Sequence, residues 1–249
     1  MAIGDSITYL DAHHEEANNR VTKGYMERVT DKLPYINYVN HGHSGWTTMS
    51  MAKAIEKLNI EKADIYTVFL GTNDWWQGLS IGSIDDYKNS TGDSTVFGAY
   101  RVIVNKIRTL NPEAHVILLT PLQRGDFVYF KKFTNNAYGS YKDKNGRNLS
   151  EFADAVKQIA DYERFDLVDL YGKSGIKPKN AVKFKLLKSP AGEYVKYEYP
   201  GYTNIPFNPA TDDYPYPIDA VNMTYDGLHP SDKGMAVIAK MLIKVMKKY

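Results

Sequence analysis

The stretch Asp64–Leu70, with the sequence DIYTVFL, decides the fold class of this 249-residue chain. It is a nearly continuous run of apolar and aromatic residues, and it does not alternate between apolar and polar side chains. Such runs are typical of parallel strands that are buried on both faces. The polar sequence Gly71-Thr72-Asn73-Asp74 follows directly. We therefore expect a buried parallel strand with polar residues at its carboxyl end.

Similar runs occur before and after this stretch, at Tyr35–Asn40 (YINYVN), Ala114–Thr120 (AHVILLT) and Phe165–Leu170 (FDLVDL). Apolar residues at helical spacing separate or follow them. Three helices are predicted, one over 100–110, one over 152–160 with Ser150 as its cap, and one over 238–245. Alternating strands and helices predict a doubly wound α/β sandwich around a parallel sheet.

Two features interrupt this pattern. Only Met1–Ile3 precede the polar sequence Gly4-Asp5-Ser6, so a first strand is unusually short. One hypothesis is that the chain is a domain cut from a longer protein. Residues 172–225 show no long helical pattern and are rich in proline and tyrosine. We expect an irregular insertion that lies against the main domain, with a short hairpin around Tyr194–Tyr199.

Composition excludes several classes of protein. The chain is 43% hydrophobic, which is ample for one packed domain over 1–249. It contains no cysteine, so disulfide scaffolds, thiolate metal sites and cysteine nucleophiles are excluded. A net charge of +2 argues against a nucleic-acid partner. No apolar run approaches the roughly 20 residues of a membrane span, and no signal peptide pattern is present. A secreted protein, or part of a larger extracellular one, stays open, and oligomeric state is not indicated.

Three polar residues suit nucleophilic acyl transfer. A serine hydroxyl needs a base within hydrogen-bond reach, and the base needs an orienting group. Ser6 is the candidate nucleophile, His229 the base and Asp226 the group that orients the imidazole. An aspartate and a histidine three residues apart can share one tight turn. Each could instead be a helix cap or turn residue, since serine and aspartate are common in both.

The tetrahedral intermediate of acyl transfer also needs hydrogen-bond donors for its oxyanion. Gly45 can offer a backbone N–H without an obstructing side chain, and Asn73 can offer its side-chain amide. The backbone N–H of Ser6 would complete this oxyanion hole. Gly45 and Asn73 both follow predicted strands, where open α/β sheets bind ligands.

These blocks resemble the SGNH hydrolases, also called GDSL esterases/lipases. Gly4-Asp5-Ser6 matches the first block, with Ile7 in place of leucine, and Gly45 matches the second. Gly71–Asp74 matches the third, and Asp226 with His229 matches the Asp-x-x-His of the last. The resemblance implies a flavodoxin-like three-layer α/β/α fold and ester hydrolysis without metal or cofactor.

Several neighbouring residues have two interpretations. Trp46 and Trp75 each follow an oxyanion block and could wall a substrate pocket or fill the core. His43 could line the same pocket. Asp5 and Asp74 are expected to order their loops. The sequence His13-His14-Glu15-Glu16 is interpreted as a charged surface loop rather than a metal site.

The sequence thus predicts a serine esterase that removes small acyl groups, O-acetyl above all, from a carbohydrate or another small molecule. A lysophospholipase or other acyl-ester hydrolase is the enzymatic alternative. A carbohydrate-binding module of a larger surface or phage-tail protein is the alternative from another class.

Overall fold

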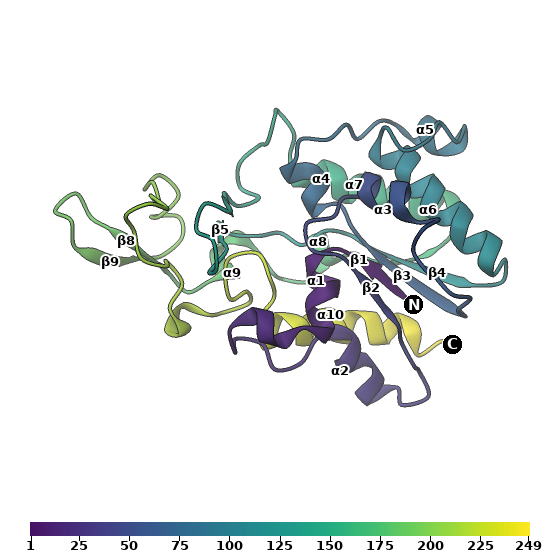
Figure 1. Cartoon of the computed structure of the whole chain (residues 1–249), viewed down its shortest axis with the longest axis horizontal. Coiled ribbons are helices and arrows are strands. Elements are labelled where there is room, and N and C mark those ends of the chain that lie inside the picture. Colours follow the sequence, from purple (N-terminus) through teal and green to yellow (C-terminus); the bar gives the residue numbers. More distant parts are fainter.

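The computed structural model describes residues 1–249 and contains the predicted parallel sheet (Figure 1). Its five strands lie in the order β2, β1, β3, β4, β7, and every neighbouring pair is parallel. The strands are β2 (Asn40–Gly42), β1 (Ala2–Gly4), β3 (Ile65–Phe69), β4 (His115–Leu119) and β7 (Asp166–Val168). This is a doubly wound order, in which successive strands are added first on one side of β1 and then, from β3 onward, on its other side. The predicted α/β fold class is confirmed.

Three of the four predicted strand runs contain a strand, but the prediction for Tyr35–Asn40 is wrong. Only Asn40 of that run belongs to β2, an edge strand. The side chains of Tyr35 and Val39 are exposed to solvent. A short apolar run therefore indicated a strand where the chain only approaches the sheet edge.

Helices cover both faces of the sheet, which gives three layers (Figure 1). One face carries α3 (Thr48–Ala54), α4 (Thr72–Trp76), α5 (Ile84–Lys88), α6 (Val96–Leu110) and α7 (Leu149–Glu163). The other face carries α1 (Ser6–Tyr9), α2 (Tyr25–Lys32) and α10 (Asp232–Met246). None of these helices combines the length and apolarity needed to cross a membrane.

The two cores follow from the alternation of side chains along each strand. Val116 and Leu118 of β4 belong to the core under α6 and α7, whereas Ile117 and Leu119 belong to the core under α2 and α10. The three predicted helices are present. The cap of α7 is Asn148 rather than Ser150, which lies inside the first turn.

Irregular segments extend beyond the carboxyl ends of the strands (Figure 1). They contain two antiparallel pairs, two short helices and three 3₁₀ turns. These elements are β5 (Phe127–Val128), β6 (Asn136–Ala137), α8 (Leu170–Lys173), α9 (Pro178–Ala181), β8 (Lys185–Lys188), β9 (Tyr194–Tyr197), and the turns Leu10–Ala12, His14–Ala17 and Ile218–Ala220. The predicted hairpin is confirmed as β8–β9.

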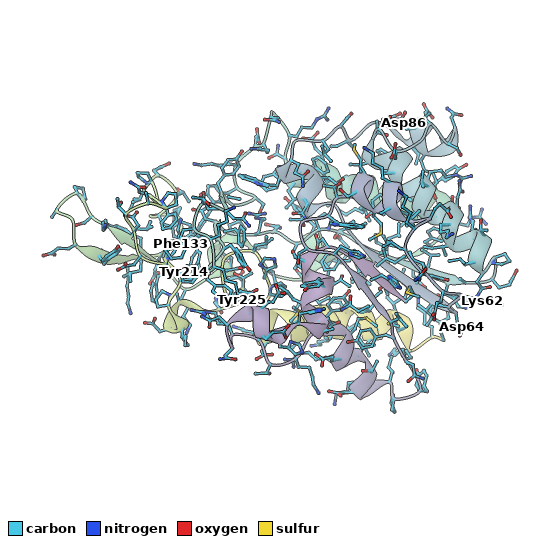
Figure 2. The ribbon with its side chains drawn as sticks, in the orientation of Figure 1. Lys62, Asp64, Asp86, Phe133, Tyr214 and Tyr225 are labelled. Atoms are coloured by element: carbon cyan, nitrogen blue, oxygen red, sulfur yellow. The ribbon has the colours of Figure 1, made fainter.

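The 172–225 insertion packs against the segment that carries β5 and β6. Val128, Val182 and Tyr216 form a small apolar cluster there, and Phe133 and Tyr214 pack beside it with ring centroids 5.7 Å apart. Figure 2 shows Phe133 and Tyr214 together, with Tyr225 nearer the sheet. The insertion thus joins the fold at the end where ligands bind in open α/β sheets.

Asp11 is a buried carboxylate at the start of α2, where its Oδ2 accepts from Met26 N at 2.8 Å. Burial raises its pKa from 3.8 to about 7. The folded protein therefore holds this proton more tightly than the unfolded chain. The contribution to stability is complete at low pH and is lost as pH rises through about 7.

We expect Asp11→Asn, which keeps an acceptor oxygen but does not titrate, to remove this dependence. The free energy of unfolding of wild type, relative to Asp11→Asn, should fall by about 2 kcal/mol between pH 5 and pH 8. Urea unfolding of both proteins at these pH values measures it. A difference that stays constant with pH would contradict the prediction.

Candidate active site

Ser6 lies at the first position of α1, directly after β1 ends at Gly4. Asp5 is the residue that caps this helix, and its Oδ1 accepts from Ile7 N at 3.0 Å. Burial raises the pKa of Asp5 to about 6. Since Asp5 does the capping, the hydroxyl of Ser6 is free to face the end of the sheet.

The turn before α10 places His229 beside Ser6, although the two residues are 223 positions apart in the sequence. His229 Nε2 lies 2.8 Å from Ser6 Oγ, and His229 Nδ1 lies 2.7 Å from Asp226 Oδ2. Asp226 Oδ1 accepts from the backbone N–H groups of Leu228 and His229, at 3.0 and 2.7 Å. The side chains of Asp226 and His229 are both buried. The hydrogen bond between the carboxylate and Nδ1 fixes the orientation of the imidazole.

Gly227 allows this turn to approach the segment after β4. Its φ of +91° lies in the left-handed region, and a Cβ there would stand 1.6 Å from Asp126 O. Gly227 O accepts from Gly125 N at 2.8 Å, and Gly227 N donates to Thr224 Oγ1 at 3.1 Å. Only glycine satisfies both the backbone angle and the close contact.

Three donors border the space beside Ser6. The backbone N–H groups of Ser6 and Gly45 make no hydrogen bond within the protein. Asn73 Nδ2 makes one, to Trp46 O at 2.9 Å, which leaves its second hydrogen unused. Gly45 has a φ of +78° in the turn closed by the 3.2 Å hydrogen bond from Trp46 N to His43 O. These residues have the unused donors that an oxyanion hole requires.

Asp74 joins the two segments that carry Gly45 and Asn73. It is fully buried, and it accepts from Thr48 N at 3.0 Å and from Thr48 Oγ1 at 2.6 Å. Burial raises its pKa to about 6. Asp74 thus ties the start of α3 to the start of α4, in agreement with its expected ordering role.

A pocket of about 380 Å³ opens at this point and contains Ser6, Gly45, Asn73 and His229. That volume suits a small ligand. Further residues on its wall come from segments that the motifs did not include: Trp76, Arg124, Phe127, Tyr129, Asn135 and Tyr225. The Phe127 ring meets the His229 ring edge-on, with centroids 5.4 Å apart.

The structure does not place the three predicted substrate contacts in this wall. Trp75 is fully buried in the core, where its Nε1 donates to Arg147 O at 2.9 Å. Trp46 packs against the same core and stacks on His43, with ring centroids 4.0 Å apart. Trp76 borders the pocket instead, because the next position on α4 points to a different side.

Arg124 is one of the pocket residues that the motif analysis missed. It is 1% exposed, and burial lowers its pKa to about 10. The signal was its position, since it follows the run Ala114–Thr120 by four residues, at the end of the sheet where sites occur.

The residues His13–Glu16 make internal contacts. His14 Nε2 lies 2.6 Å from Glu27 Oε2, and Glu16 Oε1 accepts from the Tyr9 hydroxyl at 2.9 Å. No group of three or more histidine, aspartate or glutamate side chains is arranged to hold a metal ion.

Gly227→Ala should unfold more readily than wild type, by about 2 kcal/mol or more, because strain at positive φ adds to the clash with Asp126 O. Gly192→Ala is the matched control, since Gly192 has a φ of +86° but open space around it. Thermal and urea unfolding of both variants measure the difference. Equal losses in the two variants would show that the close approach is not important.

Comparison with known proteins gives concordant results. A model of the GDSL-like lipase/acylhydrolase family matches residues 2–237. A solved structure from Chitinophaga pinensis DSM 2588, described as a possible lipase, is 55% identical, with a TM-score of 0.98 over 99% of this chain and 96% of that one. Comparison with curated proteins finds no match.

Two more distant structures share the fold. An acetyl xylan esterase is 19% identical, with a TM-score of 0.55 over 98% of this chain and 97% of that one. A carbohydrate esterase family 3 protein from Talaromyces cellulolyticus is 17% identical, with a TM-score of 0.53 over 100% of this chain and 98% of that one.

Proposed function

Since the chain belongs to the GDSL-like lipase/acylhydrolase family, whose members are esterase-type hydrolases, we propose that Ser6, His229 and Asp226 form its catalytic triad. The observation that carries this proposal is the continuous chain of hydrogen bonds from Asp226 through His229 to Ser6, which ends at the pocket.

The geometry supports a two-step reaction. Ser6 Oγ attacks the ester carbonyl while His229 Nε2 accepts the hydroxyl proton, and Asp226 stabilises the imidazolium that forms. The tetrahedral intermediate collapses, the bond to the alcohol oxygen breaks, and that oxygen takes the proton from His229. Water then attacks the acyl-enzyme with His229 again as base. This releases the acid and restores Ser6.

The oxyanion of each tetrahedral intermediate would lie against the N–H groups of Ser6 and Gly45 and the amide of Asn73. These donors are already oriented by α1, by the turn at Gly45 and by the contact of Asn73 with Trp46. Donors that are fixed before the reaction do not have to reorganise as charge develops, and this is the source of their effect.

We infer that the substrate carries a small acyl group, O-acetyl in the first instance, on a carbohydrate. The pocket is small, and its wall combines aromatic rings with polar side chains, as sugar recognition requires. Two proteins that share the fold are described as an acetyl xylan esterase and a carbohydrate esterase.

A longer-chain acyl hydrolase is the second candidate, favoured by the 55% identical protein described as a possible lipase. A carbohydrate-binding module is the third, and the complete hydrogen-bonded triad argues against it.

Hydrolysis by wild type and Ser6→Ala tests the proposal. The panel runs from 4-nitrophenyl acetate to octanoate and includes acetylated oligosaccharides. We expect acetate-selective hydrolysis by wild type and a loss of at least a thousandfold in Ser6→Ala, because the nucleophile is removed. Faster hydrolysis of octanoate would favour the lipase. Hydrolysis by neither protein, together with glycan binding by both, would favour the binding module.

Asn73→Ala should lower kcat by roughly a hundredfold or more with a smaller change in KM, because the lost donor acts mainly on the oxyanion. Gln77→Ala is the control, since Gln77 borders the same pocket and its Nε2 donates one hydrogen bond, to the carbonyl oxygen of Gly45 at 3.3 Å. Steady-state kinetics with 4-nitrophenyl acetate measure both. A change confined to KM in Asn73→Ala would exclude an oxyanion role.

A further inference from the structure

The guanidinium of Arg124 is buried in the pocket wall without a partner. The side chain is 1% exposed, and its Nε and Nη2 atoms make no hydrogen bond. No ion pair joins it to any carboxylate of the protein. Burying a charged group without a partner is costly, so an unpaired arginine beside an open pocket indicates a missing ligand.

The nearby carboxylates are already engaged with other groups. Asp126 accepts from Lys185 Nζ at 2.8 Å, from Tyr141 Oη at 2.6 Å and from Gly139 N at 2.8 Å. Asp226 accepts from His229 and from backbone N–H groups. Both acids lie close enough to favour the charged form of Arg124, but neither bonds to it.

Aromatic rings and backbone hydrogen bonds hold Arg124 in place. Its guanidinium carbon lies 5.6 Å from the Trp75 ring centroid, 5.8 Å from that of Trp76 and 5.9 Å from that of Phe127. Its backbone N and O both bond to Ser140, with distances of 2.9 to 3.1 Å. The rings stabilise the cation by their faces, and they leave its N–H groups unused.

We propose that Arg124 binds a carboxylate of the substrate, so that the enzyme acts on esters that also carry a carboxylate group. This inference rests on the proposed function and names its substrate class. Arginine offers a planar pair of N–H donors that matches a carboxylate, and the buried setting strengthens that bond. The carboxylate belongs either to the sugar, as in a uronic acid, or to the acyl group, as in a dicarboxylic half-ester.

Glu16 is the one acidic side chain that faces the same pocket, and it bonds to the Tyr9 hydroxyl and not to Arg124. Its carboxylate would repel an anion bound beside it, whereas the guanidinium of Arg124 would attract one.

Two matched pairs of esters test the proposal and distinguish the two sources of the carboxylate. Acetylated methyl glucuronoside is compared with acetylated methyl glucoside, and the mono-4-nitrophenyl ester of glutaric acid with 4-nitrophenyl pentanoate. We expect wild type to prefer the acidic member of one pair by at least tenfold in kcat/KM. The pair that shows the preference identifies the side of the ester that carries the carboxylate.

Arg124→Met should reduce that preference to about one, chiefly through KM for the acidic ester. Arg124→Lys should keep part of it, because the charge stays. Arg108→Gln is the matched control, since Arg108 of α6 pairs with Glu163 of α7 and does not border the pocket. This variant should keep the full preference. Circular dichroism checks that each variant is folded. If Arg124→Met does not fold, the preference of wild type is compared with that of Arg124→Lys.

Absence of a preference in wild type, or a preference unchanged in folded Arg124→Met, would overturn the inference. The proposed function would stand in either case if 4-nitrophenyl acetate were still hydrolysed in a Ser6-dependent way.

If no ester were hydrolysed, the proposed function would fail separately. Calorimetric binding of methyl glucuronoside and glutarate, against methyl glucoside and butyramide, would then test Arg124 directly. Binding of the neutral compounds as tightly as the acids would overturn the inference.

Discussion

The hydrogen bond between Ser6 and His229 is the contact on which the rest of the site depends, because it joins residues 223 positions apart. Ser6 is fixed by the shortest route, from β1 into the first turn of α1. His229 depends on more distant support, since its turn is held by Asp226, by Gly227 against Asp126, and by the start of α10. The sheet therefore positions the serine, and the irregular segments position the base.

Much of this arrangement could be predicted from the sequence. Strands buried on both faces are recognised by their continuous apolar runs, and the polar blocks at their ends indicate the site. The strand predicted at Tyr35–Asn40 was wrong, because the apolar side chains of Tyr35 and Val39 are exposed beside the sheet edge and not buried in it. Adjacent tryptophans on α4 face different sides, so Trp75 and Trp76 could not be distinguished by position alone. The position of Arg124 after a strand run indicated only the end of the sheet, whereas the burial of its side chain among Trp75, Trp76 and Phe127 depends on contacts that no local pattern encodes.

The charged groups around the site have different surroundings. Asp5 and Asp74 are buried carboxylates whose oxygens accept hydrogen bonds from backbone or hydroxyl groups, and burial raises the pKa of each to about 6. Arg124 is buried among aromatic rings that give its N–H groups nothing to bond. The first two groups hold the loops in position. The third has donors without a hydrogen-bond partner in the protein, and this is the physical difference from which we infer its role in recognition.

Asp126 connects the insertion to the triad turn. Its carboxylate bonds to Lys185 of β8, and its carbonyl oxygen lies against Gly227. Asp126 thus contacts both the hairpin and the loop that carries His229. The position of β8 is therefore linked to the backbone beside the base through a buried ion pair of 2.8 Å. The hairpin and the catalytic turn thus share Asp126 as a common contact, although Lys185 and Tyr225 are 40 positions apart in the sequence.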